Sequence, residues 1–157
     1  MLDQLDELYR DVILDHFKNS SHAGELPSAQ IKAEGSNPLC GDELAFDIMM
    51  DGPTLRQVRF HGKGCAISQA AASMLSQQLE GRTAAEARRL IEALKALMQG
   101  HEPPAPARDT PGGPGDASAD LGDLEALAGV RKFPVRVKCA ALSWNIIEQG
   151  LNGHGAH

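Results

Sequence analysis

The sequence predicts an α+β fold, in which a small three-stranded antiparallel sheet is packed by helices. Three observations lead to this prediction. Residues 2–17 and the segment 83–100 each carry a helical stripe of apolar side chains. Residues 43–60 alternate apolar and polar side chains around a DGP turn, as β-hairpins do. The chain has 157 residues, 42% of them hydrophobic, so we expect residues 1–157 to form one domain with its own core.

The N-terminal half of the chain supplies the predicted sheet. A first helix is expected over residues 2–17, and a short irregular strand over residues 31–35. The hairpin strands are 43–50 and 55–60, and alternation directs one set of apolar side chains to the core: Leu44, Phe46, Ile48, Leu55, Val58 and Phe60. The sequence GKGC ends the second of these strands.

The C-terminal half is predicted to be mostly helical. A helix follows Cys65, and one face of it is almost all Ala and Ser, small enough for close packing against the sheet. A second helix begins at a capping box of Thr83 and Glu86 and stops at Gly100. The segment HEPPAPARDTPGGPGDASAD has no large apolar residue, so we expect a mobile surface loop at about 101–119. A short helix closed by Gly129, an extended lead-in and a final helix that starts at Cys139 complete the chain. Trp144 is expected in the core.

Composition excludes several classes of partner. The net charge is −6, the Lys and Arg residues are scattered, and aromatic residues make up only 4% of the chain. Nucleic-acid binding needs a clustered basic face or stacking aromatics, so no nucleic-acid partner is predicted. No apolar stretch approaches the roughly 20 residues of a membrane span, and the acidic start MLDQLDELYRD does not resemble a signal peptide. We therefore expect no membrane partner and a location in the cytoplasm.

The three cysteines are the candidate functional residues. Cys40, Cys65 and Cys139 are odd in number, so they cannot all pair within one chain. Cys65 and Cys139 are predicted at helix N-termini, which favour anions, and Cys40 lies two residues before Asp42 across a glycine turn. If the fold brings the thiols together, Asp42 completes a tetrahedral site of three sulfurs and one oxygen. On spacing alone, three small buried hydrophobic residues remain the alternative, because no C-x2-C pair is present.

Other polar residues are assigned to ordinary roles. His61 is predicted to point to the surface, opposite Phe60 on its strand. Asp47 and Asp51 are interpreted as solvent-facing strand and turn residues.

Three segments carry a resemblance to a known family. SNPLCGDE, FHGKGCAIS and RVKCAALSW resemble the three ligand motifs of the IscU/NifU-type iron–sulfur cluster assembly family, over nearly the entire chain. IscU-type members have a histidine immediately before the third cysteine, where this chain has Lys138. That residue, together with an insertion over roughly residues 100–130, resembles the SufU branch.

The resemblance implies a SufE/IscU-like fold and a role in iron–sulfur cluster biogenesis. It implies zinc held by Cys40, Asp42, Cys65 and Cys139, with Cys40 as the catalytic residue that accepts persulfide sulfur from a SufS-like cysteine desulfurase. Downstream iron–sulfur assembly or acceptor proteins are the other implied partners. The alternative is a non-enzymatic scaffold that assembles a transient [2Fe–2S] cluster on the same ligands, so whether the chain is an enzyme stays open. A purely structural zinc domain is the third reading.

Overall fold

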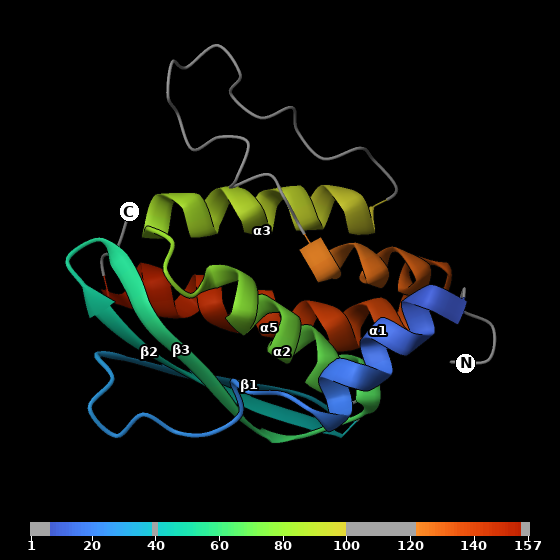
Figure 1. The fold of residues 1–157 in the computed structure, drawn as a ribbon, viewed down its shortest axis with the longest axis horizontal. Helices are drawn as coiled ribbons and strands as arrows, with labels where there is room; N and C mark the ends of the chain where they lie inside the picture. The colour runs from blue at the N-terminus through green and yellow to red at the C-terminus, as the bar shows by residue number, and fades with distance from the viewer. Residues whose placement is uncertain (1–6, 39–40, 100–121, 155–157) are drawn as a thin grey trace, which may run out of the picture.

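The computed structural model describes residues 7–38, 41–99 and 122–154 (Figure 1). Three strands form one antiparallel sheet in the order β1-β2-β3, with β1 at Ile31–Asn37, β2 at Asp42–Asp51 and β3 at Thr54–Lys63. Helices pack on this sheet, so the predicted α+β fold is confirmed. The predicted strands are all present, each somewhat longer than the sequence pattern indicated.

Strand alternation places the core between the sheet and the helices. Phe46 pairs with Ala33 on β1 and with Phe60 on β3, and Ile48 pairs with Ile31 and Val58. The side chains of Phe46, Ile48 and Val58 are completely buried. The hairpin turns at Gly52, whose φ of 59° lies in the left-handed region that glycine adopts readily. The register of the sheet is therefore set by one apolar face.

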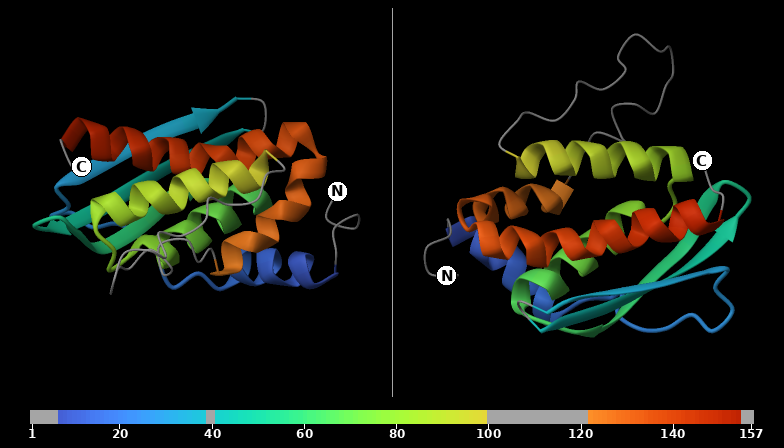
Figure 2. Two further views of the ribbon diagram at one scale, coloured as in Figure 1. Left: turned by 90° about the horizontal axis from the view of Figure 1, so that it is seen from above. Right: turned by 180° about the vertical axis from the view of Figure 1, so that it is seen from behind.

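The helices gather on one side of the sheet (Figures 1 and 2). They are α1 (Glu7–Lys18), α2 (Ala66–Leu79), α3 (Ala84–Met98), the 3₁₀ helix η2 (Gly122–Lys132) and α5 (Pro134–His154). Helices α2 and α5 contact the sheet directly, and α3 packs against α5 and η2. In helix α2, Ala70, Ala71 and Ala72 are completely buried, as expected for a helix whose small side chains permit close packing. Trp144 on α5 is also buried.

The predicted capping box of α3 is present in both directions. Glu86 N donates to Thr83 Oγ1, and Thr83 N donates to Glu86 Oε1, each at 3.1 Å. Two backbone donors that the helix itself cannot satisfy are thereby satisfied. The predicted stop at Gly100 and the predicted loop at 101–119 lie outside the described residues.

The region before Cys139 differs from the prediction in two ways. The short helix is a 3₁₀ helix that continues past Gly129 to Lys132. Its buried residues Leu124, Leu127 and Val130 recur every three positions, which is the period of a 3₁₀ helix. The predicted extended lead-in is also wrong, because α5 already begins at Pro134.

Proline explains where α5 starts. It is favoured at the first position of a helix, since its ring fixes φ and its missing N–H is not needed there. The carbonyl of Phe133 accepts hydrogen bonds from Arg136 N at 2.8 Å and Val137 N at 3.1 Å, which closes the first turn. Cys139 consequently lies in the second turn of α5 and not at its beginning.

Asp47 is buried, contrary to the prediction that it faces solvent. Its Oδ2 accepts a hydrogen bond from Leu26 N at 2.8 Å. The chain leading to Leu26 runs beside β3, where Gly24 N donates to Phe60 O at 2.8 Å. This segment covers part of the outer face of the sheet, so strand alternation alone did not predict the burial of Asp47. Asp51 is exposed, as predicted.

No helix within the described ranges combines the length and the apolar character that crossing a membrane requires.

Candidate metal centre

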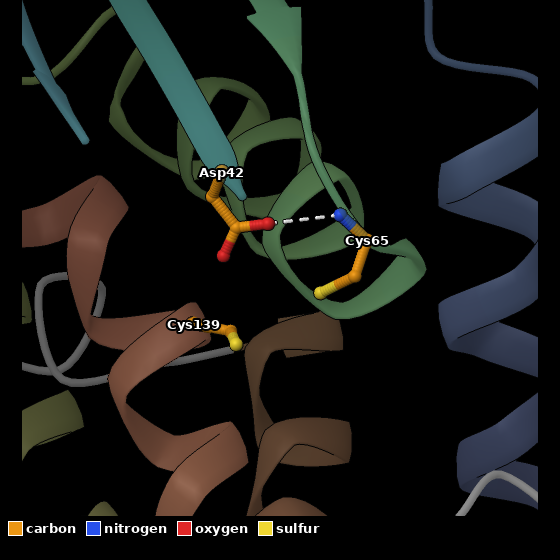
Figure 3. A group of neighbouring side chains, drawn as sticks. All are labelled: Asp42, Cys65 and Cys139. Atoms are coloured by element: carbon orange, nitrogen blue, oxygen red, sulfur yellow. Dashed lines mark hydrogen bonds between the residues drawn. The ribbon is translucent and has the colours of Figure 1, made fainter. Parts of the chain in front are cut away.

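Three of the four predicted ligands converge in the structure. One carboxylate oxygen of Asp42 and the sulfurs of Cys65 and Cys139 all lie within 4.8 Å of one another. The three residues come from the start of β2, the N-terminus of α2 and the second turn of α5 (Figure 3). The fourth predicted ligand, Cys40, lies outside the described residues. Segments far apart in the sequence therefore meet at one end of the sheet.

Asp42 is positioned by the first residues of β2. Gly41 precedes it with a φ of 70°, a left-handed conformation that confirms the predicted glycine turn. Asp42 then pairs with Asn37 at the end of β1, which fixes its backbone in the sheet. Its side chain is only 1% exposed.

The two oxygens of Asp42 have different environments. Oδ1 accepts a hydrogen bond from Cys65 N at 2.9 Å and lies 3.1 Å from the Ser68 hydroxyl, which can donate to it. Oδ2 is buried and has no hydrogen-bond partner in the described part of the chain. In Figure 3 this second oxygen points into the space that the two sulfurs also face. A buried carboxylate oxygen without a partner is costly unless a cation or a donor satisfies it.

Cys65 lies at the N-terminus of α2, as predicted, and the structure shows that it is the N-cap residue. Its backbone is extended, and its sulfur lies 3.5 Å from Ser68 N, which donates to it. The first turn of α2 contains no acidic residue that could offset the positive end of the helix dipole. The side chains of Cys65 and Asp42 supply electron-rich atoms at this position instead.

Cys139 is completely buried on α5. Its sulfur lies 3.8 Å from Asn37 Nδ2 and 3.8 Å from the carbonyl oxygen of Val135. The basic residues Arg136 and Lys138 occupy the same turn of the helix, Arg136 half-buried and Lys138 exposed. Positive charge therefore lies close in sequence to this buried sulfur.

The donor set fits zinc. Zinc binds thiolate sulfur at about 2.3 Å and carboxylate oxygen at about 2.0–2.2 Å in a tetrahedral arrangement, so neighbouring ligand atoms lie about 3.7 Å apart. The three described ligand atoms, within 4.8 Å of one another, need to close by about 1 Å at most. Thiolate ligands equally suit iron–sulfur units. Asp42 Oδ2, which has no partner among the described residues, is the structural feature that a cation would satisfy.

Sequence reasoning missed two residues beside the site. Ser68 was assigned to the packing face of α2, yet its hydroxyl contacts Asp42. Gly64 was interpreted only as the end of a strand, yet a Cβ atom there would lie 2.3 Å from Ser68 Oγ and 2.7 Å from Asp42 Oδ1. The spacing C-x-x-S contained the signal for Ser68, because the third residue of a helix is within reach of the N-cap.

His61 does not join the candidate metal centre. Its side chain is 34% exposed and lies on the outer face of the sheet, where Nε2 is 3.5 Å from Asp47 Oδ1 and Nδ1 is 3.8 Å from Glu25 Oε1. This agrees with the prediction that it points away from Phe60.

The fold and the site together define a class of protein: a small helix-covered sheet that brings two cysteine sulfurs and a carboxylate together at one end. Residues 8–140 match the family model for the NifU-like N terminal domain. The chain belongs to this family.

Two curated relatives cover nearly the whole chain. A protein of Bacillus subtilis named zinc-dependent sulfurtransferase SufU is 42% identical over 94% of this chain and 91% of its own length. A protein of Streptococcus pyogenes named iron–sulfur cluster assembly scaffold protein IscU is 34% identical over 96% of this chain and 86% of its own length.

Solved structures share the fold. A crystal structure from Fervidobacterium islandicum, assigned as an iron–sulfur cluster assembly scaffold protein for the SUF system, superposes with a TM-score of 0.77 at 31% identity, covering 90% of this chain and 94% of the other. The N-terminal part of a nitrogen-fixing NifU-like protein from Brucella abortus superposes with a TM-score of 0.76 at 22% identity, covering 94% of each chain. The latter likeness concerns the fold alone.

Proposed function

We propose that this protein acts in iron–sulfur cluster biogenesis as a zinc-bound acceptor of persulfide sulfur. The observation that carries the proposal is the convergence of Asp42, Cys65 and Cys139, with the buried Asp42 Oδ2 lacking a partner among the described residues. The relative that is 42% identical is named a zinc-dependent sulfurtransferase, which supports the same activity here.

The proposed ligands are Cys40, Asp42, Cys65 and Cys139. Cys40 is two residues from Asp42, and the left-handed Gly41 between them allows the chain to reverse direction at this point. Zinc would hold the three chain segments together and, as a Lewis acid, keep its thiol ligands deprotonated. Three thiolates and one carboxylate outweigh its charge, so Arg136 and Lys138 are proposed to offset the remaining negative charge.

In the proposed reaction, Cys40 is the nucleophile. Its thiolate attacks the outer sulfur of a protonated persulfide on a cysteine desulfurase. The new bond joins the two sulfurs on Cys40, the sulfur–sulfur bond of the desulfurase breaks, and its cysteine leaves as a thiolate. Cys40 then carries the persulfide, and no external oxidant or reductant is consumed.

The remaining residues have supporting roles in this proposal. Asp42, Cys65 and Cys139 are fixed by a strand and two helices, so they keep the site in place while Cys40 reacts. Lys138 is exposed beside Cys139 in the sequence and is suited to attract the negative charge that develops on the leaving thiolate of the partner. A SufS-like desulfurase, downstream iron–sulfur assembly proteins and a cytoplasmic location complete the proposal, in which residues 1–157 act as one domain.

A desulfurase turnover assay tests the role of Cys40. A SufS-like desulfurase is incubated with cysteine and either the unchanged chain, Cys40→Ala or Ser76→Ala, and alanine production is followed. Cys40→Ala should abolish stimulation, because the attacking thiolate is lost. Ser76→Ala is the control, since this serine is buried elsewhere on α2. Full stimulation by Cys40→Ala would contradict the proposal.

A scaffold that assembles a transient [2Fe–2S] cluster is the second candidate function. The observation that favours it is the 34% identity to the S. pyogenes scaffold protein over nearly the entire chain. Anaerobic reconstitution with iron and sulfide, followed by visible absorption, separates the two. A stable iron–sulfur chromophore that displaces zinc would favour the scaffold, whereas retained zinc without a chromophore would favour sulfur transfer.

A further inference from the structure

We propose that Ser68 is a positioning residue that restricts Asp42 to binding zinc through Oδ2 alone. This inference rests on the proposed zinc site and concerns the side chain that orients one of its ligands.

The two carboxylate oxygens of Asp42 differ in their hydrogen bonds. Oδ1 accepts a hydrogen bond from Cys65 N at 2.9 Å and lies 3.1 Å from the Ser68 hydroxyl, and these two donors are three residues apart at the start of α2. Oδ2 has no partner in the part of the chain that the structure describes, although it is buried. Because both donors occupy Oδ1, Oδ2 is the oxygen left for a metal, and the carboxylate is directed to bind through that one atom.

Burial and additional hydrogen bonds hold Ser68 in this position. It is completely buried, and its backbone N–H also donates to the sulfur of Cys65 at 3.5 Å. Its hydroxyl has a second acceptor, the carbonyl oxygen of Cys65 at 3.0 Å. An ionised carboxylate is the stronger acceptor of the two, so the single hydroxyl proton is expected to favour Asp42.

Gly64 makes the contact between Ser68 and Asp42 possible. A Cβ atom at residue 64 would approach Ser68 Oγ to 2.3 Å and Asp42 Oδ1 to 2.7 Å. Both distances are shorter than a real Cβ atom tolerates, so only glycine leaves room for the two polar side chains to meet here. Glycine at position 64 therefore leaves the space in which the hydrogen bond between Ser68 and Asp42 can form and orient the carboxylate.

Residues that hydrogen-bond to a metal ligand commonly influence metal affinity. Groups that hydrogen-bond to a ligand fix its orientation, and their removal typically weakens metal binding by about 10- to 100-fold. Ser68 has one hydrogen bond of this type and Cys65 N supplies another, so the lower end of that range is expected for loss of Ser68 alone.

A double-mutant cycle on the reduced, metal-free full chain tests the inference. Zinc affinity is measured by competition with a chromogenic chelator for the unchanged chain, Ser68→Ala, Asp42→Ala and the double variant. Ser68→Ala should weaken zinc binding about tenfold in the unchanged chain. In the Asp42→Ala background the same change should alter affinity by less than about twofold, because Ser68 acts through Asp42.

Ser76→Ala is the matched control. Ser76 lies on the same helix and is equally buried, but its hydroxyl has no hydrogen-bond partner among the described residues. It undergoes the same chemical change at a distance from Asp42, and zinc affinity should stay within about twofold. Thermal melts of all variants verify that the fold is retained.

The outcomes distinguish the inference from the function on which it rests. Unchanged zinc affinity in Ser68→Ala, or an equal loss with and without Asp42, would overturn the positioning role while leaving the zinc site in place. Unchanged affinity in Asp42→Ala would show that Asp42 is not a ligand, and both the proposed ligand set and this inference would fail.

Discussion

Two carboxylates at opposite ends of helix α2 have contrasting environments. Glu80, the C-cap residue, has a polar contact at both oxygens: Oε2 accepts from Val58 N at 2.9 Å and Arg59 Nη1 at 2.6 Å, and Oε1 lies 3.4 Å from His22 Nε2. Asp42, at the N-terminal end, has one satisfied oxygen and one buried oxygen without a described partner. Glu80 links the end of α2 to β3 through contacts within the chain. Asp42 still has one oxygen that can bind a cation.

The electrostatics of Glu80 support the structural role. Burial raises its pKa, but the hydrogen bond from Val58 N and the hydrogen bond and charge of Arg59, with a contribution from His22, outweigh burial and lower the pKa below its ordinary value of 4.5. The folded state therefore favours the ionised form of Glu80. If the two ends of α2 differ in this way, changes near Asp42 should alter zinc affinity, whereas a change at Glu80 should alter stability alone.

Zinc removal should have the largest effect on stability. A ligand present at about 1,000 times its dissociation constant stabilises the folded state by about 4 kcal/mol, so a chelator should lower Tm by about 8–16 °C for a chain of this size. The aliphatic core lies between the sheet and the helices, so the metal-free chain should keep its far-UV circular dichroism below Tm. Loss of that signal on chelation would favour the purely structural zinc domain.

Cys65→Ser should weaken zinc binding about 100-fold. Binding free energies of about 10–16 kcal/mol for four-ligand sites correspond to about 3 kcal/mol per ligand, and every 1.4 kcal/mol is about tenfold. Serine is a favoured N-cap, so α2 should remain capped while the soft sulfur is lost. Zinc competition and a thermal melt measure both quantities. Zinc affinity equal to that of the unchanged chain would exclude Cys65 as a ligand.

Gly64→Ala should weaken zinc binding about tenfold without removing any polar group. The added methyl group would displace Ser68 or Asp42, because it would meet both of their oxygens. Gly81→Ala is the control glycine, since a Cβ atom there has nothing within 4 Å, although its φ of 90° costs some stability. Both variants are compared by zinc competition, and equal affinities would show that the close approach at residue 64 has no effect on the site.

Glu80→Gln should have the smallest effect and should leave zinc affinity unchanged. The loss of charge-assisted hydrogen bonds is expected to destabilise the fold by about 1–2 kcal/mol, an effect limited by the 28% exposure of the side chain. Ionised Glu80 stabilises the unchanged chain above pH 4.5, and this contribution is lost as the pH falls through the lowered pKa of the folded state. The stability difference between the two chains should therefore shrink in that acidic range, as denaturant unfolding at several pH values would measure.

The sequence predicted elements whose signals are local. The alternation around residues 43–60 and the capping box of Thr83 and Glu86 depend on neighbouring residues, and both were confirmed. The position of Cys65 at the N-terminus of a helix was also predicted, because a glycine-rich turn precedes a helical pattern. The C-x-D spacing drew attention to Asp42, and three of the proposed ligands do converge.

Two of the errors arose where tertiary contacts decide the structure. The predicted extended lead-in is a different case, because the signal that starts α5 is local: proline is favoured at the first helical position, and the carbonyl of Phe133 closes the first turn. Asp47 was predicted to face solvent because the chain leading to Leu26 could not be placed over the sheet from its sequence. The contact of Ser68 with Asp42 joins residues 26 positions apart, and no periodic pattern encodes such a pair.

The most direct test of the account is X-ray absorption at the zinc edge, on full-length protein purified without added metal. The account predicts one zinc per chain with a coordination number of four: three sulfurs at about 2.3 Å and a single oxygen at about 2.0 Å. A second carboxylate oxygen would contradict the one-oxygen binding of Asp42. A shell made only of nitrogen and oxygen, or protein free of zinc, would contradict the proposed site itself.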